Sequence, residues 1–150
     1  MAESQVHRTM KRIVSAELTG EGYVLLEEPL FPPSRRIAWK AYRPDILGYR
    51  GAGGREEVAI VECETHPNMR RFESKNYSTL TFQPYLFRDG AIRRILAVPQ
   101  GKLRSVDLRL RREWEVWVLG SSGPLCKIGR TGDRPVGNPP RQPERPVLRA

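Results

Sequence analysis

Two stretches decide the fold of this chain: RPDILGY at residues 43–49 and VAIVECET at residues 58–65. Each is a short apolar run bounded by turn-forming residues, which indicates two neighbouring β-strands. Glu62 and Glu64 have the same parity as Val58, so all three side chains project from one face of the second strand. A carboxylate on the apolar face of a buried strand is costly to desolvate without a partner. The two stretches therefore predict acids that are held by a divalent metal ion or a buried cation.

The acids of these strands resemble the motif of the PD-(D/E)XK nuclease superfamily. Its pattern is a Pro-Asp pair on one strand and a Glu-x-Lys run on the next, shortly before a helix. Here the first half ends at Asp45, and the second half runs from Glu62 to Glu64, so that a glutamate stands where the motif usually has lysine. A subgroup of restriction endonucleases also carries an acid there. The resemblance covers residues 5–119 and implies an α/β fold with a restriction endonuclease-like mixed β-sheet flanked by helices.

The resemblance also implies a site that hydrolyses phosphodiester bonds with the help of Mg²⁺, or of Mn²⁺ in its place. Asp45 and Glu62 are the expected metal ligands, and the carbonyl of Cys63 is a further candidate, because Mg²⁺ prefers oxygen donors. Glu64 is either another ligand or the group that orients the attacking water. Lys75 lies on the helix after the strand, where some members of the superfamily carry the lysine that is missing from the motif.

A structural interpretation of the same acids stays open. The two glutamates of the second strand can form ion pairs that serve only the fold, with Arg93, Arg94 or Lys75 as partners. Glu17 and Glu21, at the end of the first predicted helix, are either solvated helix acids or the extra acid that many superfamily members carry on that helix.

The charge of the chain favours a polyanionic partner. It has 26 Lys and Arg against 17 Asp and Glu, a net charge of +9, and all but five of the basic residues are Arg. Arginine binds phosphate through two parallel hydrogen bonds, which makes nucleic acid the first candidate and DNA the favoured one. A general bias of composition toward Arg is the alternative. The candidate phosphate contacts are Arg70, Arg71, Arg93, Arg94, Arg109, Arg111 and Arg112.

Periodicity predicts an alternation of helices and strands over the first 120 residues, which we expect to form one nuclease-like domain. Helices are expected at 4–19, 67–82 and 103–110, the last favoured over a strand, and strands at 22–26, 43–49, 58–65, 92–98 and 114–119.

From residue 121 the composition changes. Residues 121–150 hold six Pro, four Gly and six basic residues against two acids. Such a segment buries too little apolar surface to offset its ordering entropy, so 121–150 is expected to be a disordered basic tail.

Two cysteines make neither a disulfide framework nor a zinc site, and neither a signal peptide nor a membrane-spanning run is apparent. The expected location is therefore the cytoplasm, without a membrane partner.

The first interpretation is an Mg²⁺-dependent endonuclease acting on DNA; the small archaeal Holliday-junction resolvases match in size and charge, which implies a structure-specific substrate. The alternatives are a nucleic-acid-binding module that has lost catalysis on the same fold, and a polyanion-binding interaction protein with structural acids. A homodimer is left open.

Overall fold

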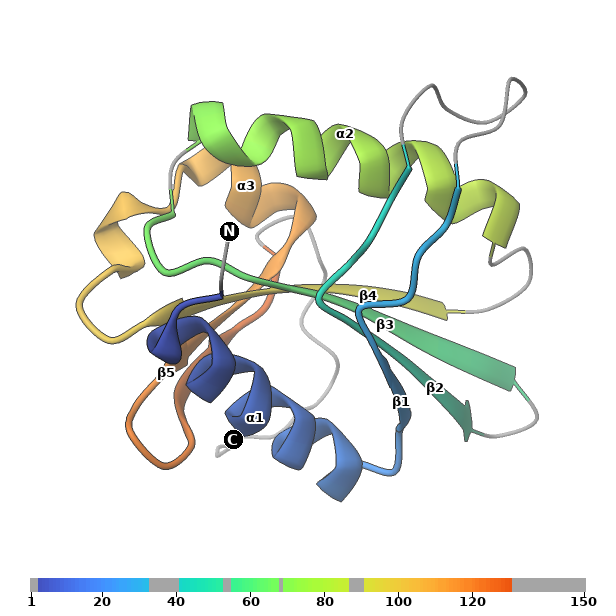
Figure 1. Ribbon diagram of the computed structural model, residues 1–150, viewed down its shortest axis with the longest axis horizontal. Helices are drawn as coiled ribbons and strands as arrows, with labels where there is room; N and C mark the ends of the chain where they lie inside the picture. Colours follow the sequence, from blue (N-terminus) through green and yellow to red (C-terminus); the bar gives the residue numbers. More distant parts are fainter. Residues whose placement is uncertain (1–2, 33–40, 53–54, 68, 87–90, 131–150) are drawn as a thin grey trace, which may run out of the picture.

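Among the residues described, one six-stranded sheet carries helices on both faces (Figure 1). The computed structural model describes residues 3–32, 41–52, 55–67, 69–86 and 91–130. The strands are β1 (Val24–Glu27), β2 (Ile46–Ala52), β3 (Arg55–Cys63), β4 (Ala91–Pro99), β5 (Glu115–Leu119) and β6 (Pro124–Ile128). The helices are α1 (Gln5–Gly20), α2 (Met69–Leu86), a short 3-10 helix η1 (Leu103–Ser105) and α3 (Leu108–Glu113).

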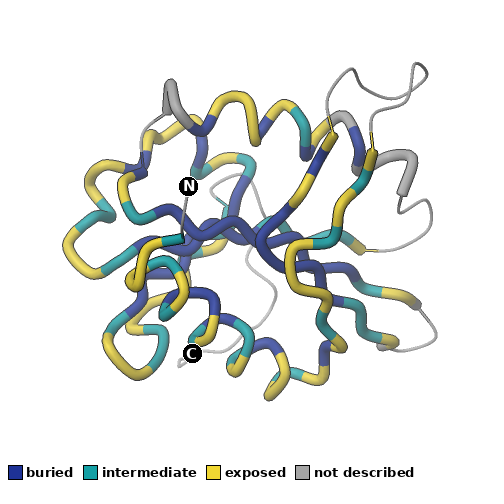
Figure 2. The backbone as a smooth tube through the Cα atoms, viewed as in Figure 1, coloured by how far each residue is buried: buried dark blue, intermediate teal, exposed yellow. Residues whose placement is uncertain are grey.

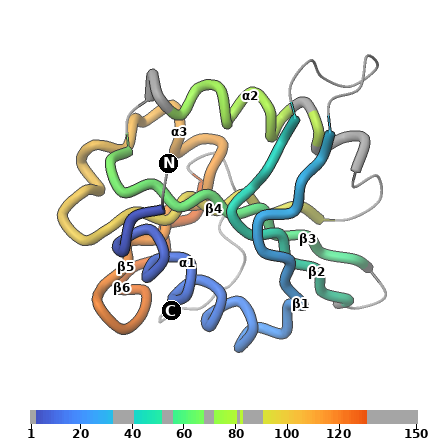
Figure 3. Tube along the Cα trace, in the orientation of Figure 1, coloured from blue at the N-terminus to red at the C-terminus, as the bar shows by residue number. Residues whose placement is uncertain are grey.

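The sheet is mixed, as the sequence predicts. Its strands lie in chain order from β1 to β6, with β3, β4 and β5 parallel and the remaining neighbours antiparallel. Parallel neighbours need a crossover connection. Helix α2 provides it between β3 and β4, and η1 with α3 provides it between β4 and β5, as Figure 3 traces. The expected α/β architecture is therefore confirmed.

Helix α1 covers one face of the sheet. Ser4 caps its start by accepting a hydrogen bond from the backbone N–H of His7 at 3.1 Å, which satisfies one of the free donors of the first turn. Met10, Val14 and Leu18 are fully buried against inward-facing residues of β2 to β5. Figure 2 shows the buried residues concentrated along the central strands beside this helix.

Helices α2 and α3 cover the opposite face. Phe82 of α2 packs on Tyr42 with ring centroids 5.4 Å apart, and Phe72 meets Trp114 edge-on at 5.1 Å. Phe72 belongs to the same buried cluster as Leu110 of α3. The aromatic contacts therefore place the first half of α2 beside α3 and its second half over β2 and β3.

Several boundaries differ from the sequence-based expectation: the helix predicted at 103–110 is η1 followed by α3, and the strands predicted at 43–49 and 58–65 are found at 46–52 and 55–63. Helix α2 continues to Leu86, although Pro84 was expected to lie beyond its end; the buried Phe82 anchors this last turn. Strand β6 lies within the segment expected to be disordered from residue 121, because its pairing with β5 supplies the backbone partners that a composition rich in Pro and Gly does not reveal. Residues 131–150 lie outside the described residues.

No helix in the described ranges has the length and apolar content that crossing a membrane requires.

Because β6 belongs to the sheet, truncations before and after this strand should affect the melting temperature differently. Ending the chain after Arg130 keeps every described element, so we expect an unchanged melting temperature. Ending it after Gly120 removes β6 and the ion pairs of Lys127 with α1. We expect the melting temperature to fall by at least about 4 °C, the shift that about 1 kcal/mol produces in a domain of this size. Equal melting curves for the two truncated proteins would contradict the assignment of β6 to the fold.

Candidate active site

Asp45 and Glu62 lie close together at one end of the paired strands β2 and β3. Asp45 immediately precedes β2, and its backbone N–H donates to the carbonyl oxygen of Val61 at 3.1 Å. Ile46 pairs with Val61 in the antiparallel register, so Asp45 lies beside the end of β3, where Glu62 projects to the same face as Val58 and Ile60, the face covered by α2. The carboxylate of Asp45 is fixed further by the backbone N–H of Cys63, which donates to Oδ2 at 2.7 Å.

Glu62 is the most unusual group of the site. Its exposed fraction is 1%, and neither carboxylate oxygen accepts a hydrogen bond from a described residue. Burial, reinforced by the negative charge of Asp45, holds the pKa of this carboxyl well above its usual range. The nearest cation is the ammonium of Lys75, with Nζ 3.5 Å from Oε1 of Glu62. An acid in this position costs free energy until a cation lies close to it.

Lys75 reaches the two glutamates of β3 from α2. Its Nζ donates to Oε2 of Glu64 at 2.5 Å. Burial disfavours the charged form of Lys75, but Glu62 and Glu64 outweigh that effect and raise its pKa above the usual value. Of the partners considered for a structural ion pair, Lys75 contacts both acids, whereas Arg93 pairs with Glu21 and Glu115, and Arg94 donates to the backbone carbonyl of Glu113 in α3.

A pocket of about 520 Å³ opens over this cluster. It is lined by Glu3, Ser4, His7, Glu28, Cys63, Glu64, Thr65, His66 and Lys75. Asp45 and Glu62 are not part of the lining, but each contacts a residue that is: Asp45 contacts His7, and Glu62 contacts Lys75. The two central carboxylates therefore lie one side chain behind the pocket surface. Both histidines of the chain line the same pocket.

The first helix contributes a chain of contacts that the sequence analysis missed. Glu3, His7 and Lys11 are spaced four residues apart, so they lie along one face of α1. Nδ1 of His7 lies 2.6 Å from Oε2 of Glu3, and Nε2 lies 3.3 Å from Oδ2 of Asp45. The i, i+4 spacing of an acid, an imidazole and a lysine was the available signal. This face of α1 holds Asp45 from the side opposite to α2.

Glu28 closes the same side of the site. Its backbone N–H donates to the carbonyl oxygen of Asp45 at 2.9 Å, and its carboxylate accepts from Nζ of Lys11 at 2.6 Å. Glu28 has a φ of 48°, in the left-handed region that is unfavourable for residues with a side chain. Strained backbone of this kind persists only where surrounding contacts enforce it. The Lys11 ion pair and the bond to Asp45 are those contacts.

Glu17 and Glu21 lie elsewhere. Both pair with Lys127 of β6, and Glu21 also accepts from Arg93 at 2.9 Å. They are neither the extra acid of the site nor simply solvated. Their ion pairs fasten the C-terminal half of α1 to the far strands of the sheet.

The candidate phosphate contacts fall into three groups. Arg93, Arg94 and Arg111 are engaged by the fold; Arg111, for example, donates to the carbonyl oxygen of Leu103 at 2.9 Å. Arg109 and Arg112 are exposed on α3. The side chains of the remaining two candidates, at positions 70 and 71, lie outside the described residues.

The donor set fits a hard divalent cation. In the part of the chain that the structure describes, no three His, Cys, Asp or Glu side chains gather in the geometry of a metal site. Mg²⁺, however, keeps several waters and is commonly held by one or two carboxylates. Asp45 and the buried Glu62 offer such a pair, with Glu62 making no hydrogen bond to a described residue. The carbonyl of Cys63 remains a predicted third donor.

Comparison with known proteins gives two structural neighbours. No protein-family model matches the chain, and no curated protein matches it. A fdxN element excision controlling factor protein from Anabaena variabilis is similar with a TM-score of 0.50 and 12% identity. An XisH family protein from Nostoc punctiforme is similar with a TM-score of 0.50 and 11% identity. In each case the match covers 81% of this chain and 99% of the other, and at such identity it shows a shared fold.

The buried carboxylate predicts a stability gain on neutralisation. In the unfolded chain Glu62 ionises near pH 4.3, whereas in the folded protein its pKa is raised. The free energy of unfolding therefore falls as the pH rises from about 4.3 to the raised pKa. Without added metal, Glu62→Gln should therefore raise the free energy of unfolding by about 1–3 kcal/mol at pH 8, and the gain should shrink toward pH 4. Urea denaturation at both pH values measures it. Glu56→Gln, an exposed acid on β3, is the matched control and should change little.

Proposed function

We propose that this protein is an endonuclease that hydrolyses phosphodiester bonds in DNA with the help of Mg²⁺ or Mn²⁺. The observation that carries the proposal is the carboxylate of Glu62, buried beside Asp45 without a hydrogen bond from a described residue and directly behind a pocket. Burying this carboxylate costs free energy that one ammonium group at 3.5 Å offsets only in part. Strongly perturbed carboxyls beside a cleft are typical of functional sites.

Each residue of the cluster has a role in this proposal. A divalent cation held by Asp45 and Glu62 would stabilise the charge that develops on the phosphate and lower the pKa of an attacking water. Lys75 lies at the pocket surface, where its ammonium can contact a non-bridging oxygen of the scissile phosphate. Glu64 holds Lys75 in place and borders the same space, so it can also accept a proton from the attacking water.

The partner follows from charge. The chain carries a net charge of +9, which favours a polyanion, while the pocket itself is lined by several acids. An acidic centre repels phosphate unless a cation neutralises it, so binding of the substrate and of the metal ion should support each other. Branched DNA is included among the proposed substrates because the small junction resolvases of the resembled superfamily match this chain in size and charge.

A second candidate function rests on a specific contact. Lys75 already lies against both Glu62 and Glu64, so the acids have a cationic partner within the chain. The site could then be a remnant of catalysis in a nucleic-acid-binding module. The two functions differ in whether Asp45 and Glu62 bind a divalent cation.

Metal binding should appear as thermal stabilisation. A cation that binds only the folded state at 100 times its Kd adds about 2.7 kcal/mol to the free energy of unfolding. We expect Mg²⁺ or Mn²⁺ at millimolar concentration to raise the melting temperature of the wild type by several degrees. Glu62→Gln should abolish the shift, whereas Glu56→Gln should keep it. A wild type that no divalent cation stabilises would favour the binding module.

Cleavage rates separate the roles of the two charged residues on the pocket rim. If Lys75 contacts the phosphate, Lys75→Ala should lower the cleavage rate constant about 10²–10³-fold, the effect of removing a preorganised charge or donor. Lys75→Arg keeps the positive charge and should retain part of the wild-type rate. If Glu64 accepts the proton, Glu64→Gln should be inactive. The assay uses linear duplex, single-stranded and branched DNA under saturating Mg²⁺. Full activity in Glu62→Gln would show that the site is assigned wrongly.

A further inference from the structure

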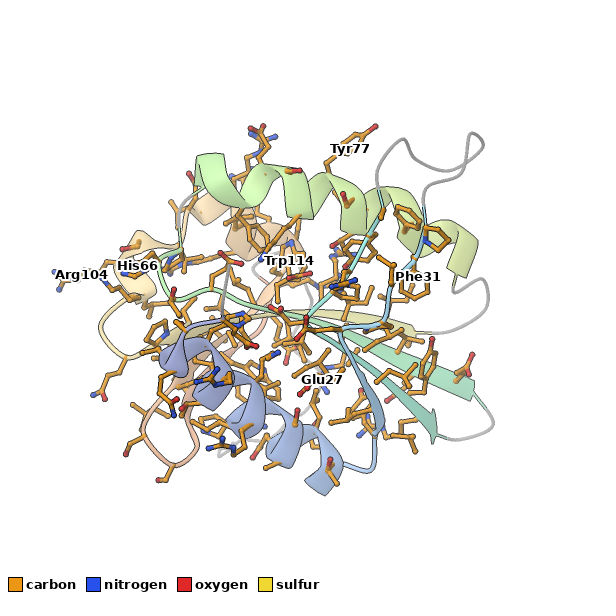
Figure 4. All side chains as sticks on the ribbon, viewed as in Figure 1. Glu27, Phe31, His66, Tyr77, Arg104 and Trp114 are labelled. Carbon is orange, nitrogen blue, oxygen red and sulfur yellow. The ribbon has the colours of Figure 1, made fainter. Side chains whose placement is uncertain are left out.

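A basic segment leaves the sheet at the same edge as the pocket. Strands β3 and β4 are parallel, Cys63 pairs with Ala97, and the backbone N–H of Glu64 donates to the carbonyl oxygen of Ala97 at 2.9 Å. The residues that follow each strand therefore emerge together at the carboxyl edge of the sheet. After β3 they lead to His66 in the pocket lining, and after β4 they lead to Arg104. Figure 4 shows these two side chains at the same end of the molecule.

The segment 102–112 has the charge of a phosphate-binding surface. Its 11 residues hold five basic residues and one acid, Asp107. Arg104, Arg109 and Arg112 are exposed, and their guanidinium groups make no hydrogen bond or ion pair with any described residue. This distinguishes them from Arg50 and Arg93 of the sheet, which form ion pairs within the fold. Unpaired guanidinium groups keep all their donors for a ligand.

The segment is rigid enough to present these charges at fixed positions. Asp107 caps α3 by accepting from the backbone N–H of Arg109 at 2.7 Å. Val106 and Leu110 are buried in the cluster that also contains Trp114, and Arg111 ties α3 back to η1. Positions 109 and 112 are three residues apart, so their side chains share the outer face of the helix.

Leu108 gives the surface an apolar element. Its exposed fraction is 70%, and it is flanked on the same outer face by Arg109 and Arg112. A leucine among unpaired arginines does not suit a ligand that offers only charge. It suits a ligand in which apolar sugar and base edges alternate with phosphates.

We propose that the outer face of residues 102–112 binds the sugar-phosphate backbone of the nucleic acid whose scissile bond enters the pocket. Arg104, Arg109 and Arg112 contact phosphates, and Leu108 contacts the sugar or base edge between them. This inference rests on the proposed function and adds to it the direction from which the substrate strand reaches Lys75. Binding by this face should be independent of sequence, because phosphate contacts carry no base information.

The test compares two double variants with the same loss of charge. Arg109→Gln with Arg112→Gln removes two cations from the outer face of α3, and Arg8→Gln with Arg12→Gln removes two exposed cations from α1. Affinity for a duplex of mixed sequence is measured in EDTA at several salt concentrations. Each lost phosphate contact lowers the log–log salt slope by about 0.9, so the α3 variant should lose up to about 1.8 and the α1 variant close to none.

The outcomes separate this inference from the proposed function. A wild type that binds no DNA, either in EDTA or with Mg²⁺ present, would overturn both. Binding and cleavage by the wild type, with equal slopes in the two double variants, would overturn the surface alone. Leu108→Ser should weaken DNA binding severalfold without changing the slope. If polyglutamate displaced DNA from the wild type as well as unlabelled DNA does, and the α3 variant no longer bound polyglutamate, the surface would be assigned to an acidic polypeptide. That result would overturn the nucleic-acid assignment.

Discussion

The structure depends on burying acidic groups at the end of two paired strands. Glu62 projects among the apolar residues of β3, and Asp45 lies near it, directly before β2. Neighbouring carboxylates in a site of low polarity repel each other and are poorly solvated, so the surrounding elements must supply positive charge or donors. Lys75 from α2 supplies a positive charge beside Glu62, and the backbone N–H of Cys63 supplies a hydrogen-bond donor to Asp45. The helices are therefore placed by electrostatics as well as by packing.

Helix α1 serves the same constraint from the other side. His7 contacts Asp45, and Lys11 holds Glu3 and Glu28 together beside it. Lys11 is buried although it is charged, which is tolerable because two carboxylates surround it and raise its pKa. At its other end α1 is tied to β6 through Lys127. A helix that the sequence presents as an amphipathic cover thus also fixes the geometry of the candidate site.

The elements that could be predicted are those that depend on the spacing of apolar residues along a short stretch of sequence. The apolar runs around Asp45 and Glu62 gave two strands, and the position of Lys75 on the next helix brought it to the acids. What could not be predicted depends on contacts between distant segments. Strand β6 exists because β5 offers an open edge, and Glu28 adopts its left-handed φ because Lys11 and Asp45 hold it from both sides. Neither contact leaves a trace in composition or periodicity.

Glu64 stands where the resembled motif usually has lysine, and the positive charge beside the acids of β3 comes from Lys75 of α2. Three carboxylates and the ammonium of Lys75 leave the cluster with two negative charges when all are ionised, a state that burial and the charge of Asp45 disfavour by raising the pKa of Glu62. One divalent cation would neutralise it. Because Lys75 reaches the acids on a flexible side chain that is 44% exposed, it can stabilise the fold and still turn toward a phosphate at the pocket surface. A lysine on the strand, at the position of Glu64, would lack that freedom.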